Sequence, residues 1–183
     1  MGHLVSDRQS GIKAGRRAFP RPAGTMARTT VIWGAAVSWG MCRLFGMLAA
    51  EPQTAEQWLV RSDRSLLAQS NATPDTAQRD GWGIGWFEPQ DRVRIEKGAG
   101  GAFEAAERPR FERAAADAKG TVVVGHLRHA SNPLQLSREQ LLGLENSQPF
   151  GTHTTLFAHN GMIPFPNETR PYLGVHAGEV KGV

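Results

Sequence analysis

Residues 41–47 read Met-Cys-Arg-Leu-Phe-Gly-Met, and this stretch decides how the fold and function of the 183-residue chain are interpreted. It contains Cys42, the one cysteine of the sequence. If Met41 is the initiator and is removed, Cys42 becomes the first residue and carries a thiol and a free α-amine together. An amine with a pKa of ~8 beside a thiol with a pKa of ~8.5 can act as base and nucleophile within one residue.

The composition predicts one globular domain. Hydrophobic residues make up 40% of the chain and charged residues 21%, which is ordinary for a soluble protein. No apolar run approaches the roughly 20 residues needed to span a bilayer, so no membrane partner is expected. A single cysteine excludes an internal disulfide and an all-cysteine metal site, and it favours a reducing, cytoplasmic location.

The positive charge is concentrated before Cys42. The net charge of +4 suggests nucleic acid at first sight. Residues 1–41, however, contain six basic residues and one acidic residue, which leaves 15 basic and 16 acidic residues for 42–183. The part expected to fold is close to neutral, so no nucleic-acid partner is predicted.

Residues 1–41 are interpreted as a leader that is not part of the fold. They show no sustained helical or strand period and contain Pro20 and Pro22. Three interpretations compete: sequence upstream of a true start at Met26 or Met41, a propeptide cleaved before Cys42, or an Arg-rich targeting peptide. We favour the first, because a methionine directly before Cys42 is not something that a cleavage site would require.

The remaining pattern predicts strands and helices in separate runs, which favours an α+β fold. Strands are expected over residues 42–50, 82–87, 92–97, 121–127 and 153–158. Helical segments are expected over 54–69, in two pieces, and over 102–118 with an interruption at Pro109. Residues 132–149 are expected to form a loop.

Two strand-associated segments carry polar residues suited to a site. Residues 79–86 read Arg-Asp-Gly-Trp-Gly-Ile-Gly-Trp, and the glycines permit close approach of a ligand or, equally, of another backbone. Residues 125–131 read Gly-His-Leu-Arg-His-Ala-Ser. Arg128, at the end of an apolar strand, needs an anion, either a bound carboxylate or an internal acidic residue. His126 and His129 have no third ligand nearby, so core imidazoles are expected and no metal site is predicted.

Two later segments complete the set. Residues 144–150 read Leu-Glu-Asn-Ser-Gln-Pro-Phe and alone suggest only a polar loop. Asn160-Gly161 follows a predicted strand, and Asn-Gly is a strong hairpin signal. The alternative is an oxyanion hole made by the Asn160 amide and the Gly161 N–H, in which one donor contributes roughly 3 kcal/mol to the barrier.

Taken in order, these five motifs resemble the class II glutamine amidotransferases, which are N-terminal-nucleophile hydrolases. They are most similar to the small stand-alone branch, whose members begin Met-Cys and lack a synthetase domain. The resemblance covers residues 41 to about 165. It implies a four-layer αββα sandwich, in agreement with the α+β pattern, with no cofactor and no metal.

The resemblance also implies roles for individual residues. Cys42 matches the nucleophile, Asn160 and Gly161 match the oxyanion hole, and Arg128 matches the residue that grips the α-carboxylate of glutamine. The other substrate-binding positions that it implies are Ser131, His129, Asp80, Gly81, Trp82 and Gly83. The expected reaction releases ammonia and glutamate from glutamine, or from a related γ-glutamyl amide, through a γ-glutamyl thioester.

Two departures from the family pattern affect these expectations. Residues 166–183 are expected to be an irregular tail left by a truncation or frameshift, and its acids, Glu168 and Glu179, are not assigned to binding the substrate amine. The attached leader would leave Cys42 without a free amine. The alternatives are therefore an inactive remnant that acts as a binding module, or a hydrolase of another γ-glutamyl or amide compound. A metal-binding protein using His126, His129, His159 and Cys42 is disfavoured, and a separate acceptor synthase remains a potential partner.

Overall fold

The computed structural model describes residues 30–33, 41–132, 135–161 and 166–179. Most of the predicted leader, residues 1–29 and 34–40, lies outside the described residues. The strands are β1 (Thr30–Trp33), β2 (Arg43–Thr54), β3 (Trp82–Glu88), β4 (Arg92–Gly98), β5 (Lys119–Leu127), β6 (Phe150–Gly151) and β7 (Leu156–Phe157). The helices and short helical turns are η1 (Gln57–Arg61), α1 (Leu66–Ser70), η2 (Pro74–Thr76), η3 (Pro89–Asp91), α2 (Arg108–Asp117), α3 (Arg138–Leu141), η4 (Leu144–Asn146), α4 (Pro166–Thr169) and η5 (Arg170–Glu179).

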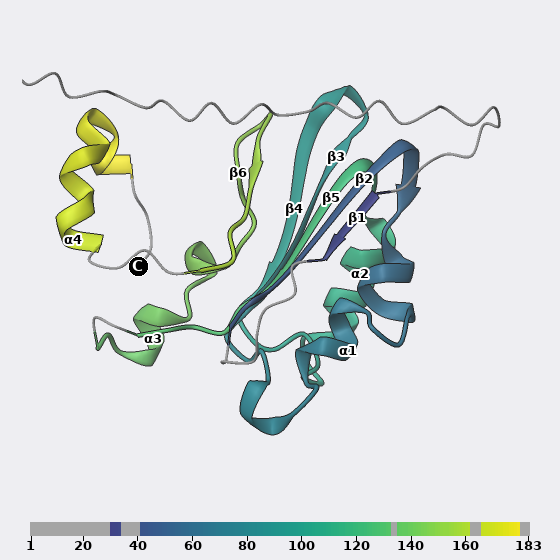
Figure 1. Cartoon of the computed structure of the whole chain (residues 1–183), viewed down its shortest axis with the longest axis horizontal. Coiled ribbons are helices and arrows are strands. Elements are labelled where there is room, and N and C mark those ends of the chain that lie inside the picture. The colour runs from purple at the N-terminus through teal and green to yellow at the C-terminus, as the bar shows by residue number, and fades with distance from the viewer. Residues whose placement is uncertain (1–29, 34–40, 133–134, 162–165, 180–183) are drawn as a thin grey trace, which may run out of the picture.

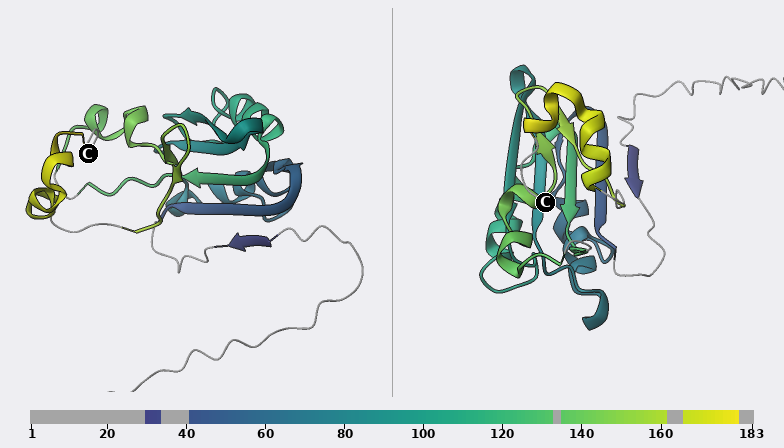
Figure 2. Two further views of the ribbon diagram at one scale, coloured as in Figure 1. Left: turned by 90° about the horizontal axis from the view of Figure 1, so that it is seen from above. Right: turned by 90° about the vertical axis from the view of Figure 1, so that its left-hand side faces the viewer.

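The centre of the fold is a five-stranded sheet with the order β1-β2-β5-β3-β4, in which every neighbouring pair is antiparallel (Figure 1). Because β2 and β3 both run opposite to β5, the first residues of β2 and β3 lie at the same end of the sheet as the last residues of β5. Figure 2 shows β1 along the outer edge, beside β2. Three chain segments that are distant in sequence therefore meet at one sheet end.

One face of this sheet is covered by helices and forms the core. Trp82, Ile84 and Trp86 alternate along β3 and are almost fully buried, as the period of two in a strand requires. Trp82 meets Phe111 of α2 edge to face, with ring centroids 5.2 Å apart. On β5, a side chain at Gly125 would collide with leucines of η1 and α1, so this glycine lets the helices approach the sheet closely.

The other face is covered by the β6–β7 ribbon, which Figure 1 shows on the side opposite to α1 and α2. A Cβ at Gly83 would lie 2.2 Å from the carbonyl oxygen of Gln148, and one at Gly85 would lie 2.8 Å from the side chain of Leu156. The layers therefore follow in the order helix, sheet, sheet. The predicted α+β class is confirmed, and this order is that of the first three layers of an αββα sandwich.

The strands with clear alternation were predicted correctly at 42–50, 82–87, 92–97 and 121–127, and β2 continues to Thr54. The two helical pieces predicted over 54–69 are present as η1 and α1. The helix predicted over 102–118 is present only as α2, because residues 102–107 form turns. The interruption expected at Pro109 was wrong: Pro109 lies in the first turn of α2, where its missing N–H has no intrahelical partner to lose.

Segments with weak local patterns differ from the predictions. The expected loop over 132–149 contains α3 and η4, and α3 begins with a capping box formed by Ser137 and Gln140. The strand expected over 153–158 is restricted to β7. A strand, β1, occurs where no strand period was found. Residues 166–179, expected to be irregular, form α4 and η5.

No helix among the described residues is long and apolar enough to cross a membrane.

Candidate active site

The sheet end where β2, β5 and β3 converge brings Cys42, Arg128 and Gly81 together. Arg43 and Trp82 both lie opposite Leu127 in the strand register, so Cys42, Arg128 and Gly81 occupy the next positions along these strands. The backbone N–H of Arg128 donates to the Gly81 carbonyl at 2.8 Å. These three residues lie on the sheet face away from the core, because their strand neighbours Arg43, Leu127 and Trp82 lie on the face that the helices cover.

The Cys42 thiol is half-buried beside the main chain of His129. The backbone N–H of His129 donates to Cys42 Sγ at 3.3 Å, and Sγ lies 3.5 Å from the His129 carbonyl oxygen. Burial raises the pKa of the Cys42 thiol, although the His129 backbone and the Arg128 charge lower it in part. The thiol is therefore protonated at neutral pH, and a nearby base is needed to generate the nucleophilic thiolate.

Arg128 is only 9% exposed, and its guanidinium bonds to main-chain oxygens. Nη1 donates to the carbonyl oxygens of Leu141 at 2.7 Å and Asp80 at 3.3 Å. Among the described residues, no carboxylate lies within ion-pair distance of Arg128, so the internal salt bridge considered from the sequence is not formed there. The Asp80 carboxylate instead accepts from the Ala130 N–H at 2.8 Å and lies 3.7 Å from Arg138.

Asn160 reaches Cys42 across 118 residues of sequence: its Nδ2 donates to the Cys42 carbonyl oxygen at 3.0 Å. An amide nitrogen carries two N–H groups, so this bond leaves a second donor in the same place. The Asn160 Oδ1 is buried and has no partner among the described residues. Gly161 has a φ of +144° and open space around its Cα, a conformation that favours glycine.

The other residues expected in the site differ in their surroundings, and not all of them face Cys42. His129 contributes its main chain to Cys42, while its Nδ1 lies 3.4 Å from the Ala77 carbonyl oxygen. Ser131 is exposed. Gly81 has a φ of +127°, and a side chain there would collide with Ser147. The Gln148 backbone packs directly against Gly83, so this glycine is needed for packing and has no space beside it for a substrate.

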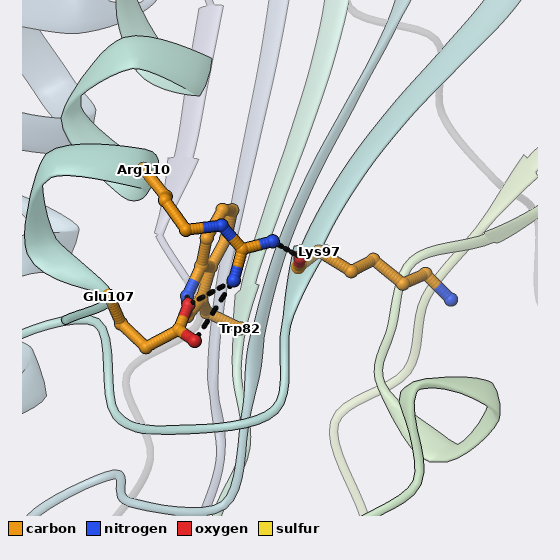
Figure 3. Close-up of polar contacts among 4 residues, drawn as sticks. All are labelled: Trp82, Lys97, Glu107 and Arg110. Atoms are coloured by element: carbon orange, nitrogen blue, oxygen red, sulfur yellow. Dashed lines mark hydrogen bonds and ion pairs between the residues drawn. The ribbon is translucent and has the colours of Figure 1, made fainter.

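The Trp82 side chain lies against Glu107 and Arg110, as Figure 3 shows, and so does not point into the candidate site. Its indole Nε1 donates to the Glu107 carboxylate at 2.8 Å, and Arg110 bonds the same carboxylate at 2.9 Å. Arg110 Nη2 also donates to the Lys97 carbonyl oxygen at 3.0 Å. The indole therefore belongs to a network that ties α2 to the sheet, on the face opposite to Cys42.

Two residues of the site face were not singled out from the sequence. Gln148 contacts His159, and the Lys97 ammonium donates to the Ser147 carbonyl oxygen. The Lys97 contact spans 50 residues and the Gln148 contact spans 11, so neither follows from a local pattern, although Gln148 belongs to the 144–150 motif. No group of three or more His, Cys, Asp or Glu side chains in the described part of the chain is arranged to hold a metal ion.

A family model described as "Glutamine amidotransferases class-II" matches residues 41–178, which is more than half of the chain. The chain belongs to the class II glutamine amidotransferases. This result confirms the family inferred from the five motifs, and the matched region begins at Met41, directly before the candidate nucleophile. A comparison with curated proteins found no match.

The amidotransferase contains a buried, neutral histidine on the same sheet face. His126 is fully buried, and neither ring nitrogen has a partner among the described residues. Burial is the main cause that lowers its pKa to about 4, and the nearby His159, Arg128 and Lys97 contribute to this lowering. Since an unfolded histidine has a pKa of ~6.5, the unfolded chain binds the extra proton more readily than the folded chain.

We therefore expect the free energy of unfolding to be highest above pH 6.5 and to fall as the pH drops toward about 4. One such histidine lowers the free energy of unfolding by about 3 kcal/mol when the pH falls through this whole range. His126→Leu should flatten this slope in urea denaturation measured between these pH values. The exposed His153 provides the control, since His153→Gln should leave the slope unchanged; an unaltered slope in His126→Leu would contradict the assignment.

Proposed function

We propose that this chain hydrolyses the side-chain amide of glutamine, with Cys42 as an N-terminal nucleophile. The observation that carries the proposal is the convergence of three groups at one sheet end. They are the half-buried Cys42 thiol, the Asn160 amide 3.0 Å from the Cys42 carbonyl oxygen, and the Arg128 guanidinium, which has no carboxylate at ion-pair distance among the described residues. Family membership supports glutamine as the amide donor.

The first half of the proposed reaction forms a thioester. With Met41 removed, the free α-amine of Cys42 takes the thiol proton, which the raised thiol pKa makes necessary. The thiolate attacks the amide carbon of glutamine, and the oxyanion of the tetrahedral intermediate is met by Asn160 Nδ2 and the Gly161 N–H. The protonated amine then gives its proton to the leaving ammonia, and the C–N bond breaks to leave a γ-glutamyl thioester on Cys42.

The second half regenerates the enzyme. Water attacks the thioester carbonyl, the same α-amine accepts the water proton, and the C–S bond breaks to release glutamate. Throughout, Arg128 pairs with the substrate α-carboxylate through its forked donors. The ammonia is released to solvent or passed to a separate acceptor synthase. A reactive thiol of this kind suits a reducing, cytoplasmic compartment.

The competing proposal is an inactive remnant that retains the fold but does not turn over. It is favoured by the covalent state of Cys42 in the full chain, in which the nitrogen is an amide and cannot act as the base. The two proposals differ in the N-terminal residue that they require. An N-terminal Cys42 supports the enzyme, and a persistent leader, residues 1–41, supports the remnant.

The test compares the chain beginning at Cys42 with the full chain. We expect at least roughly 100-fold faster glutamate release from the form with a free Cys42 amine, because a positioned base contributes about 10²–10⁴ in rate. Intact-mass measurement fixes the N-terminal residue of each preparation, and an enzyme-coupled assay measures glutamate. Equal turnover of both forms would show that the α-amine is not the base, and no turnover by either would leave the remnant as the better account.

A further inference from the structure

The segment containing Ser147 and Gln148 lies directly on the site face of the sheet. A Cβ at Gly81 would lie 2.5 Å from Ser147 Oγ, and one at Gly83 would lie 2.2 Å from the Gln148 carbonyl oxygen. Gln148 is only 8% exposed. This segment is therefore in direct contact with Gly81 and Gly83 and has no space to move closer to the sheet.

Gln148 connects this segment to the candidate oxyanion donors. Its Oε1 accepts from the backbone N–H of His159 at 2.6 Å, and its Nε2 lies 3.5 Å from His159 Nδ1. His159 immediately precedes Asn160 and Gly161. Because β7 ends at Phe157, the residues that follow it are not held by the β6–β7 ladder, and the Gln148 side chain supplies a bond in its place.

Lys97 fixes the same segment from β4. Its ammonium donates to the Ser147 carbonyl oxygen and lies 5.1 Å from the centroid of the Phe150 ring. Figure 3 shows the Lys97 side chain running away from the Trp82 and Arg110 network toward the other side of the sheet. Its own carbonyl oxygen is held by Arg110 at 3.0 Å. Gln148 is thus supported from the rigid sheet rather than from a free loop.

We propose that Gln148 is a positioning residue for the oxyanion pair, and this inference rests on the function proposed above. By fixing the His159 N–H, Gln148 sets the path of the next two residues and so aims the Asn160 amide and the Gly161 N–H at the developing oxyanion. A shift of about 1 Å in such donors can cost roughly 100-fold in rate, although the Gln148 side chain touches no reacting atom.

The kinetic test uses Gln148→Met, which keeps the length of the side chain and removes its acceptor. In the form with N-terminal Cys42, kcat for glutamine should fall about 10- to 100-fold, because an oxyanion donor acts only in the transition state. KM should change less than about twofold, because Arg128 is untouched. Gln148→Glu keeps an oxygen acceptor for the His159 N–H and should retain more of kcat than Gln148→Met. Gln69→Met is the matched control on the helix layer, where Gln69 Nε2 bonds the Arg64 carbonyl oxygen at 2.8 Å.

A second measurement does not depend on turnover. In the full chain, amide hydrogen exchange at His159 should be faster in Gln148→Met than in the unaltered protein, with no change in Gln69→Met. Unchanged exchange at His159, unchanged kcat, or a loss confined to KM would overturn the proposal. If Gln148→Met does not fold, the same criteria apply to Gln148→Leu, which also removes the acceptor. Absence of glutamine hydrolysis by the unaltered protein would instead refute the proposed function, and the exchange result would still decide whether Gln148 positions this turn.

Discussion

Replacing Cys42 with alanine is expected to abolish glutamine hydrolysis, with kcat falling by at least about 10⁴-fold in the form that begins at this residue. Alanine keeps the α-amine that acts as the base but has no atom that can form the thioester. The uncatalysed attack of water would then have only Asn160, Gly161 and Arg128 to assist it. Glutamate release measures the loss, and mass spectrometry of acid-quenched enzyme should show the γ-glutamyl adduct only in the unaltered protein.

The structure indicates that this substitution leaves the fold intact. Cys42 lies just before β2, and its side chain interacts with the His129 main chain through long sulfur contacts at 3.3 and 3.5 Å. Thermal unfolding of Cys42→Ala should therefore stay close to that of the unaltered protein. Thr54→Ala, at the far end of the same strand, is the control and should retain full kcat. Glutamate release by Cys42→Ala at the unaltered rate would rule out Cys42 as the nucleophile.

The sequence predicted the sheet well because its inner strands have strong patterns of their own. In β3, bulky Trp82, Ile84 and Trp86 alternate with Gly83 and Gly85, and both faces of the strand follow from that alternation. The same alternation places the Trp82 side chain with the core tryptophan at 86, so its orientation away from the site was available from the sequence. Trp82 was expected to bind substrate because it lies in the 79–86 motif, and that expectation did not take the alternation of side chains along the strand into account.

What could not be predicted depends on contacts between distant segments. The short ribbon of β6 and β7 has two residues in each strand, and neither strand has a pattern that separates it from a loop. Its position is determined by the glycines of β3, which leave room for Pro149 and Leu156. The polar loop before β6 similarly gains its importance from one side chain, Gln148, whose partner lies 11 residues further along the chain.

The same reasoning applies to the site. Each motif alone had a structural explanation: a hairpin at Asn160, an internal ion pair at Arg128, and a lone cysteine at position 42. The antiparallel order of the strands brings Arg128 beside Cys42, and the segment after β7 brings Asn160 to the same end of the sheet. Arg128 then bonds two carbonyl oxygens, with no carboxylate at ion-pair distance among the described residues, and Asn160 bonds the Cys42 backbone. The proposed site therefore depends on how distant segments are arranged in the fold, and this arrangement cannot be predicted from any short stretch of sequence.

Replacing Arg128 with lysine is expected to lower kcat/KM for glutamine by roughly 10²–10³, mainly through KM. Lysine keeps the charge but breaks the forked contact, and disrupting a buried, hydrogen-bonded charge pair costs about 2–5 kcal/mol. The Arg128 guanidinium has five N–H donors and already supports the carbonyl oxygens of Leu141 and Asp80. A lysine ammonium has three donors at one point and cannot hold both oxygens while also presenting two parallel bonds to a carboxylate.

The substrate provides the decisive comparison for this variant. 4-Aminobutanamide has the side-chain amide and the amine of glutamine but lacks its α-carboxylate. The unaltered enzyme should prefer glutamine over this amide by the same roughly 10²–10³ in kcat/KM that Arg128→Lys loses, and the variant should show little preference between the two. Arg138→Lys is the matched control, because Arg138 is exposed and lies 3.7 Å from the Asp80 carboxylate without contacting Cys42 or Asn160 in the structure. If Arg128→Lys loses activity equally on both amides, Arg128 supports the fold of the site rather than the substrate carboxylate, and the proposed glutamine specificity must be assigned to another residue.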